Sequence, residues 1–275
     1  MPARPVPAPA LPLGAAHAEC APQVITRRGR RTLEFVPGEV QSAMLVARPD
    51  ALVLSYCRAI MCFALFVPRP RHIIMVGLGG GSLVKFCYRH FPDVRLTVVE
   101  LRADVIALRR QFCVPDDDAR LCVVQADAST WMAQQGAVAD VIIVDGFDAH
   151  GLPAALGTAR FYRHCRRALR DGGVLCTNSF SYDPAFASIA ARLGRTFDER
   201  VCWFDKVAGN NRIMFAIKAM APCSPLPGRG LRLQRQVARH NGLGSGLLNR
   251  ALAMAVVGWL SRRKCVQKCN IYTLI

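Results

Sequence analysis

A short apolar run that breaks into a glycine-rich loop constrains the fold of this chain more than any other feature. Residues 73–76 read Ile-Ile-Met-Val, residues 77–82 read Gly-Leu-Gly-Gly-Gly-Ser, and residues 83–88 have the spacing of a helix. This order is typical of a strand, a tight turn and a helix. A ligand can approach the backbone closely at glycines, which have no Cβ atom, and three of them alternate here: Gly77, Gly79 and Gly81. The free N–H groups of the first helical turn would then face that ligand.

Each of the next three predicted strands leads into a carboxylate. These residues are Glu100, Asp127 and Asp145, and the last opens the sequence Asp-Gly-Phe-Asp that ends at Asp148. The predicted strands are 73–76, 94–99, 121–124, 141–144 and 173–178, and the predicted helices between and after them are 82–90, 102–112, 128–135, 158–170 and 184–193. Such alternation indicates parallel strands with right-handed crossovers. Because open α/β sheets bind ligands at the carboxyl ends of their strands, we expect the loop and the acids to meet there.

Each of these features also has a purely structural explanation. A glycine cluster also serves plain turns, and the dinucleotide fingerprint fits poorly because its sixth position is Ser82 here. Glu100 is placed to hold a ribose diol, or it is a solvated acid at a strand end. Asp127 is either a helix cap or an acceptor for an adenine amino group. The ordered set favours a nucleoside site more than any one member does.

The set resembles the polyamine aminopropyltransferases, or spermidine synthases. Their pattern is a glycine-rich loop, an acid after the second strand, an Asp after the third, and Asp-Ser-Ser-Asp after the fourth. The resemblance covers residues 31–219 and includes Leu-Arg-Asp-Gly-Gly at 169–173. It implies an α/β fold, namely the Rossmann-like fold of class I S-adenosylmethionine-dependent methyltransferases with a small N-terminal β unit. The loop spacing G-x-G-x-G is similar to that of the same class of enzymes.

The resemblance also implies a function in polyamine biosynthesis and the roles of individual residues. It implies a transferase that moves an aminopropyl group from decarboxylated S-adenosylmethionine to an amine such as putrescine. Asp145 would remove the proton of the amine, Asp148 would hold the amine and Tyr56 would orient it. The expected contacts of the cofactor are Gln41, Gly77, Gly79, Gly81, Glu100 and Asp127. For Gln41 and Tyr56, a solvent-facing strand residue and a core tyrosine are the structural alternatives.

Two departures from the family pattern count against a standard polyamine substrate. Gly80 stands where the family loop carries an Asp that contacts the aminopropyl amine, and Arg58 stands where the family has an acid. Losing two negative charges and gaining a positive one weakens a site for polycations. A methyltransferase that uses S-adenosylmethionine, and a non-catalytic nucleoside-binding protein, therefore stay open as alternatives.

The charge of the chain raises the question of an anionic partner. The formal net charge is +17, and no acidic residue follows Asp205. Such a tail is typical of contact with nucleic acid or an anionic membrane, or it is only a solvated basic surface. A homodimer is left open as well.

The twelve cysteines are scattered through apolar segments, which predicts buried thiols in a reducing cytoplasm and no metal site.

These patterns divide the chain into four parts. We expect a disordered proline-rich leader at 1–31, including a basic loop at 27–31, and a small unit of a β-hairpin and a helix at 32–70. The Rossmann-like catalytic domain would occupy 71–220 and close with an antiparallel hairpin of two strands, 200–204 and 212–217. A basic helical tail would follow at 221–275, with helices at 229–242 and 245–261. The run 251–260 is too short to span a bilayer.

Overall fold

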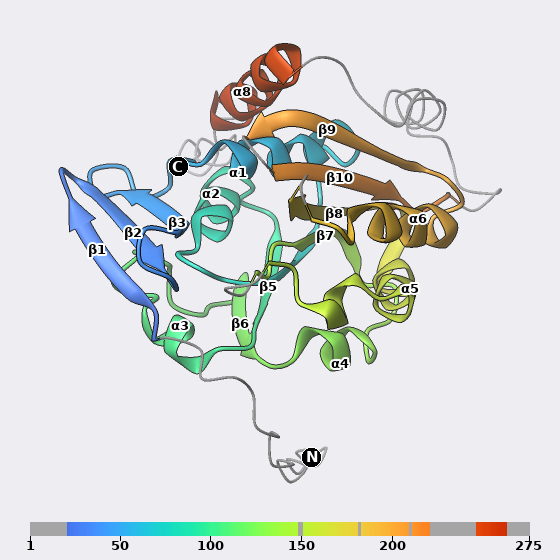
Figure 1. The fold of residues 1–275 in the computed structure, drawn as a ribbon, viewed down its shortest axis with the longest axis horizontal. Coiled ribbons are helices and arrows are strands. Elements are labelled where there is room, and N and C mark those ends of the chain that lie inside the picture. Colours follow the sequence, from blue (N-terminus) through green and yellow to red (C-terminus); the bar gives the residue numbers. More distant parts are fainter. Residues whose placement is uncertain (1–20, 148–150, 181–182, 209–210, 221–245, 263–275) are drawn as a thin grey trace, which may run out of the picture.

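A seven-stranded mixed sheet forms the centre of the molecule. The computed structural model describes residues 21–147, 151–180, 183–208, 211–220 and 246–262. The strand order is β6-β5-β4-β7-β8-β10-β9 (Figure 1). The strands are β4 His72–Val76, β5 Arg95–Glu100, β6 Leu121–Gln125, β7 Ala139–Val144, β8 Leu169–Phe180, β9 Val201–Ala208 and β10 Asn211–Ile217.

The pairing of the strands confirms the predicted α/β Rossmann-like fold. Strands β4 to β8 are parallel, and Met75 of β4 lies between Val98 of β5 and Ile143 of β7. Strand β10 pairs antiparallel with both β8 and β9, which is the predicted terminal hairpin. The order of the strands reverses between β4 and β7. At such a switch point the connections leave in opposite directions and open a crevice at the carboxyl ends of the strands.

Helices cover both faces of this sheet, since successive side chains of each strand point to opposite sides. Ile73 of β4 packs into the cluster that contains α2 and α8, whereas Ile74 packs into the cluster that contains α5 and α6. The helix predicted within 32–70 is a short α-helix continued by a 3-10 turn. The helices are α1 Ser55–Ile60, η1 Met61–Leu65, α2 Ser82–His90, α3 Ala103–Ala107, α4 Ala128–Met132, η2 Ala154–Gly157, α5 Ala159–Ala168, α6 Phe186–Thr196 and α8 Gly246–Arg262.

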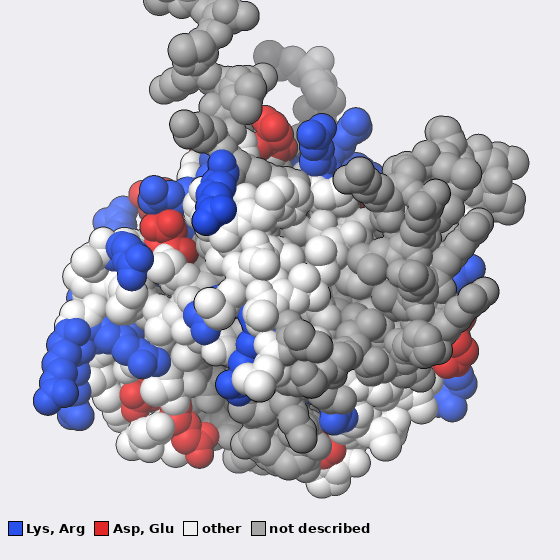
Figure 2. Space-filling model, turned by 90° about the horizontal axis from the view of Figure 1, so that it is seen from above, with Lys and Arg blue, Asp and Glu red and all other residues white. Residues whose placement is uncertain are grey.

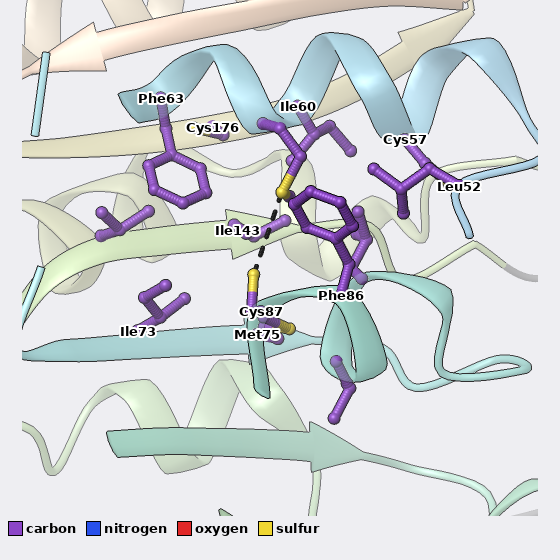
Figure 3. Packing of buried hydrophobic residues seen from close by; sticks show 14 of the residues in the cluster. Leu52, Cys57, Ile60, Phe63, Ile73, Met75, Phe86, Cys87, Ile143 and Cys176 are labelled. Carbon is purple, nitrogen blue, oxygen red and sulfur yellow. Dashed lines mark hydrogen bonds between the residues drawn. The ribbon is translucent and has the colours of Figure 1, made fainter. Parts of the chain in front are cut away.

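Cysteines form part of the core, as the sequence predicted. Cys87 of α2 donates a weak hydrogen bond to Met61 over 3.9 Å, between the side chains of Phe63 and Phe86 (Figure 3). Six of the described cysteines are buried and two, Cys113 and Cys122, are exposed. Burial raises the pKa of the Cys62 thiol to about 12. Buried thiols with raised pKa values are poor nucleophiles, so these residues act as small apolar side chains.

The N-terminal unit begins earlier than expected. It is a three-stranded antiparallel sheet of β1 Gln23–Arg27, β2 Arg30–Glu34 and β3 Val40–Leu45, at one end of the molecule in Figure 1. The prediction that 23–31 belong to the leader and a basic loop is therefore wrong. The β1–β2 turn has positive φ at both Arg28 and Gly29, the arrangement that matches the twist of a two-residue hairpin. The arginine at the first turn position concealed this hairpin, while the predicted β2–β3 pairing is confirmed.

The tail contributes one described helix. α8 coincides with the predicted helix 245–261 and packs against β9, α1 and η1 (Figure 1). The other predicted tail helix, 229–242, and the leader up to residue 20 lie outside the described residues. Among the residues that the structure describes, no helix combines the length and hydropathy needed to cross a bilayer. The four-part division of the chain stays a prediction.

Replacing Gly81 tests the geometry that starts α2. Its φ is +63°, and an added Cβ would lie 2.3 Å from the Cγ2 atom of Val114. We expect Gly81→Ala to lower the free energy of unfolding by about 2–4 kcal/mol, because backbone strain and overpacking add. Urea denaturation measures the change, with Gly136→Ala as the control, since nothing lies within 4 Å of a Cβ there. Equal stabilities of the two variants would contradict this account.

Candidate active site

A cavity of about 230 Å³ lies where the glycine loop meets the carboxyl ends of the strands. It is bounded by the N-terminal sheet, α1 and the loops that follow β4, β5, β6 and β7. Most of the residues expected from the sequence line it: Gln41, Tyr56, Gly77, Gly79, Glu100, Asp127 and Asp145. The structure therefore brings together residues that are more than one hundred positions apart. Asp148, also expected here, lies outside the described residues.

The glycine loop sits at the switch point, and Gly77 allows it to do so. Gly77 has a φ of +95°, and an added Cβ would lie 2.6 Å from the carbonyl oxygen of Asp145. Its N–H donates to the carbonyl oxygen of Val99, while the N–H of Asp145 donates to that of Val76. The loops after β4 and β7 are thus held side by side. Gly79 has a φ of +50°, which glycine adopts without strain, and it lines the cavity.

Two other glycines of the loop serve packing. Gly81 was expected to contact the cofactor, but the cavity lining does not include it. It caps α2 in a left-handed conformation against Val114. A Cβ at Gly80 would lie 2.7 Å from the Ser42 hydroxyl oxygen and 2.8 Å from the Phe112 ring. The side chains of Ser42 and Phe112 therefore fill the space that the family aspartate would need at this position.

Glu100 holds the glycine loop as well as facing the cavity. One carboxylate oxygen accepts a hydrogen bond from the N–H of Leu78 at 2.8 Å, and the other accepts one from the N–H of Arg102 at 2.9 Å. The side chain is buried. Each carboxylate oxygen has a second lone pair, so both can still accept a hydrogen bond from a ligand diol. The Glu100 carboxylate thus fixes the backbone of the glycine loop and also lines the cavity.

Asp127 is a helix cap that also lines the cavity. One of its carboxylate oxygens accepts hydrogen bonds from the backbone N–H of Thr130, at 2.9 Å, and from the Ser129 hydroxyl. Burial would raise the pKa of Asp127, but these hydrogen bonds outweigh it and leave the pKa below its ordinary value. The cap interpretation is confirmed. The proposed contact with adenine stays a prediction.

Asp145 is the most strongly perturbed acid of the site. Burial raises its pKa to about 7, against the opposing effect of hydrogen bonds from Asn178 and Tyr56. The Asn178 amide donates to Asp145 Oδ1 at 3.0 Å, and Asn211 donates to the Asn178 amide oxygen, also at 3.0 Å. Because its oxygen is occupied by Asn211, the Asn178 amide must present its N–H group to the acid. A carboxyl group with such a pKa exchanges a proton near neutral pH.

Tyr56 approaches the same carboxylate from α1. Burial and the neighbouring Asp145 raise the pKa of Tyr56 well above its ordinary value, so its phenol stays protonated and can donate. The hydroxyl also lies 3.4 Å from the carbonyl oxygen of Gln41, a residue of β3. The side chain is therefore fixed between the N-terminal sheet and the strand ends, and its contact with the amine stays a prediction.

Sequence reasoning missed Asn178, Asn211 and a pair of phenylalanines beside them. Asn178 stands near the carboxyl end of β8, the neighbour of β7, so its position at the sheet edge was a usable signal. Asn211 could not be found in this way, because it reaches the site from the antiparallel strand β10. The rings of Phe147 and Phe180 lie 5.0 Å apart and give the cavity an apolar wall.

Arg58 does not bring its charge into the cavity. Its guanidinium donates to the carbonyl oxygens of Leu52 and Val53, at 2.7 and 3.1 Å, and to the Ser55 hydroxyl at 2.8 Å. These bonds turn the side chain toward the loop before α1, and Arg58 is absent from the cavity lining. The Arg58 charge is therefore not placed to repel a polyamine in the cavity. Within the described ranges, no group of three His, Cys, Asp or Glu side chains is placed to bind a metal.

The chain has clear relatives among proteins of known family. A family model described as the spermine/spermidine synthase domain matches residues 53–190. A polyamine aminopropyltransferase of Chromobacterium violaceum is 36% identical over 203 residues, which cover 73% of this chain and 78% of that protein. The chain belongs to the spermine/spermidine synthase family. A polyamine aminopropyltransferase of Neisseria meningitidis serogroup B is 38% identical over 173 residues, covering 62% of this chain and 66% of that relative. The predicted family is therefore confirmed, and with it the assignment as an aminopropyltransferase-like enzyme.

Solved structures of the family share the fold. A probable spermidine synthase from Corynebacterium glutamicum has a TM-score of 0.64 at 20% identity, covering 86% of this chain and 91% of that chain. A spermidine synthase in complex with the transition state analogue AdoDATO has a TM-score of 0.57 at 20% identity, covering 84% and 88% of the two chains. Human methyltransferase-like protein 13, in complex with SAH, has a TM-score of 0.52 at 22% identity, with 67% and 88% covered. At these identities, the similarity shows the shared architecture.

Restoring the family aspartate tests whether its absence is built into the packing. We expect Gly80→Asp to lower the free energy of unfolding by about 1–3 kcal/mol, because Ser42 and Phe112 occupy the space of the new Cβ. Thermal or urea unfolding measures the change. Adding Ser42→Gly removes one of the two close atoms, so the double variant should recover part of the loss. A Gly80→Asp protein as stable as the parent would contradict the argument.

Proposed function

We propose that this member of the spermine/spermidine synthase family transfers an aminopropyl group from decarboxylated S-adenosylmethionine to a small-molecule amine. The observation that carries the proposal is Asp145, a carboxyl group with a pKa raised to about 7 that faces the same cavity as Glu100 and Asp127. The family assignment and the relatives named polyamine aminopropyltransferase support it. Putrescine is the first acceptor to test.

The residues on the β5–β6 side of the cavity suit a nucleoside. Glu100 has two oxygens with free lone pairs for the ribose hydroxyls, and Asp127 has a carboxylate oxygen that can accept from the adenine amino group. Gly77 and Gly79 line the cavity beside the β4–β7 crevice, where the thioether end would lie. Gln41 closes the cavity from the N-terminal sheet. The donor, when bound, supplies a carbon activated by the adjacent sulfonium.

The residues on the β7–β8 side suit proton removal from the acceptor. An alkylammonium has a pKa of about 10, so it carries almost no free lone pair at neutral pH. Asp145 would accept the proton, the freed nitrogen would form a bond to the activated carbon, and the carbon–sulfur bond would break to leave neutral methylthioadenosine. An acid with a pKa of about 7 brings the proton transfer about 4 kcal/mol closer to balance than an ordinary carboxyl group does. Tyr56 and Asn178 would orient the carboxylate.

A methyltransferase activity is the second candidate, and Gly80 favours it. Without an aspartate in the loop, the amine of an aminopropyl group has no acidic partner at this position, and a donor that keeps its carboxylate meets no repulsion there. Calorimetry with S-adenosylmethionine and its decarboxylated form separates the two candidates. Tighter binding of the decarboxylated form supports aminopropyl transfer, and tighter binding of the other form supports the alternative. The cytoplasmic location and a homodimer stay predictions.

Substitution of the proposed base tests the assignment directly. We expect the protein to release methylthioadenosine when given decarboxylated S-adenosylmethionine and putrescine. Asp145→Asn should reduce kcat/KM by a factor of about 10²–10⁴, since the amide cannot accept the proton. Asp93→Asn is the matched control, because Asp93 is exposed and lies away from the cavity. Undiminished turnover by Asp145→Asn would exclude this residue as the base, and an Asp145→Asn protein that keeps its biological activity would favour a non-catalytic binding protein.

The pH dependence of turnover tests the environment of the same acid. A base must be deprotonated to work, so kcat/KM should rise with pH and level off above about pH 7, the pKa of Asp145. The hydrogen bond from Asn178 lowers that pKa, so Asn178→Ala should move the rising limb to higher pH. Asn211→Ala leaves the Asn178 amide free to turn away from Asp145. It should therefore move the rising limb to higher pH as well, but by a smaller shift than Asn178→Ala. If the rising limb of the pH profile stays in place in both variants, Asp145 is not the group that titrates.

A further inference from the structure

Helix α8 carries apolar residues on both its inner and its outer side. Its inner side is buried against η1, α1 and β9 through Ala253, Val256 and Leu260. On the outer side Leu247 is 79% exposed and Met254 is 64% exposed. These two residues are seven positions apart, so they lie on one face of the helix together with the exposed Ala251. A surface helix normally carries mainly polar residues on the side away from the core. On α8 the exposed side chains also include four large apolar ones, Leu247, Leu252, Met254 and Trp259.

The chain around this helix is strongly basic. From residue 206 to the C-terminus it contains twelve Lys and Arg residues and no Asp or Glu. Arg250 and Arg262 are exposed on α8 itself, and Arg263, Lys264 and Lys268 follow in the sequence. Figure 2 views the molecule from the side on which α8 lies in Figure 1, and an uncharged area there is bordered by Lys and Arg side chains and by some Asp and Glu side chains. The outer side of α8 therefore combines apolar and cationic character.

This combination selects among the partners that such a surface can have. A second copy of the chain would bring another charge of +17 to the same contact, and that repulsion opposes association. Nucleic acid would use the cations but gains little from exposed Leu247 and Met254. An anionic bilayer uses both, because apolar side chains enter the boundary between headgroups and acyl chains while Lys and Arg meet the phosphates.

We propose that the outer side of α8 binds to the surface of membranes rich in anionic lipid. Its 17 residues form a helix about 25 Å long, which would lie in the plane of the interface. No described helix is long and apolar enough to span the bilayer, so the contact is peripheral. The cavity is lined by the N-terminal sheet and the strand ends, not by α8, and the proposal is independent of the reaction catalysed.

Flotation of the full-length protein with lipid vesicles tests the proposal. Vesicles of phosphatidylcholine with about one third phosphatidylglycerol should bind the protein, and pure phosphatidylcholine vesicles should bind at least tenfold less. Binding should weaken as the salt concentration rises from about 50 to 300 mM, because screening reduces the attraction to the surface. The double variant Leu247→Glu/Met254→Glu should bind at least tenfold less than the parent, since it removes two apolar contacts and adds two negative charges.

Val46→Glu is the matched control, because Val46 is an apolar residue of the N-terminal sheet region that is 45% exposed. It should bind vesicles as the parent does. Unfolding curves show whether the double variant is folded. The proposal is overturned if the folded double variant binds anionic vesicles as well as the parent, or if the parent binds neither kind of vesicle. It is also overturned if sedimentation shows a dimer of the parent that the double variant dissociates, since a second copy would then cover α8.

Discussion

The close approach of the loops after β4 and β7 is the constraint on which the rest of this structure depends. Gly77 lies so near the backbone of Asp145 that any side chain would collide with it, and the N–H of Asp145 donates to the carbonyl oxygen of Val76. The approach opens the crevice at the point where the strand order reverses. It also brings Asp145 beside the glycine loop. One backbone contact thus places the proposed base next to the proposed nucleoside site.

The chemistry of the site follows from how the carboxyl groups are surrounded. Glu100 and Asp127 accept hydrogen bonds from backbone N–H groups, and at Asp127 these bonds help to hold the pKa below its ordinary value. The donors to the Asp145 carboxylate are the side chains of Asn178 and Tyr56, and they do not compensate for its burial, which raises its pKa to about 7. Asp127 and Asp145 therefore lie at one sheet edge with pKa values shifted in opposite directions. This difference suits Asp127 to ligand binding and Asp145 to proton transfer.

The departures from the family pattern have local structural causes. At Gly80 the neighbouring side chains fill the place of the carboxylate that, in the family pattern, contacts the donor's aminopropyl amine, so that contact is absent by packing. The Arg58 guanidinium donates hydrogen bonds to backbone carbonyl oxygens in the loop before α1, so its charge lies outside the cavity. The family fold and the aspartate proposed to accept the proton are retained, while the surroundings of the donor's amine differ. The choice of donor, S-adenosylmethionine or its decarboxylated form, is therefore the property that these departures would change.

The sequence by itself determined the order of strands and helices in the Rossmann-like domain and the acids at its carboxyl edge. Apolar periodicity and glycine spacing are local signals, so α2 and the strand that leads to Glu100 could be located from neighbouring residues alone. The first hairpin was missed because Arg28 adopts a conformation that is uncommon for arginine. Only the tertiary structure decided that Asn211 supports Asn178 beside Asp145, since that contact crosses an antiparallel pair of strands. The pKa of Asp145 was likewise undetermined by sequence, because burial is a property of the assembled fold.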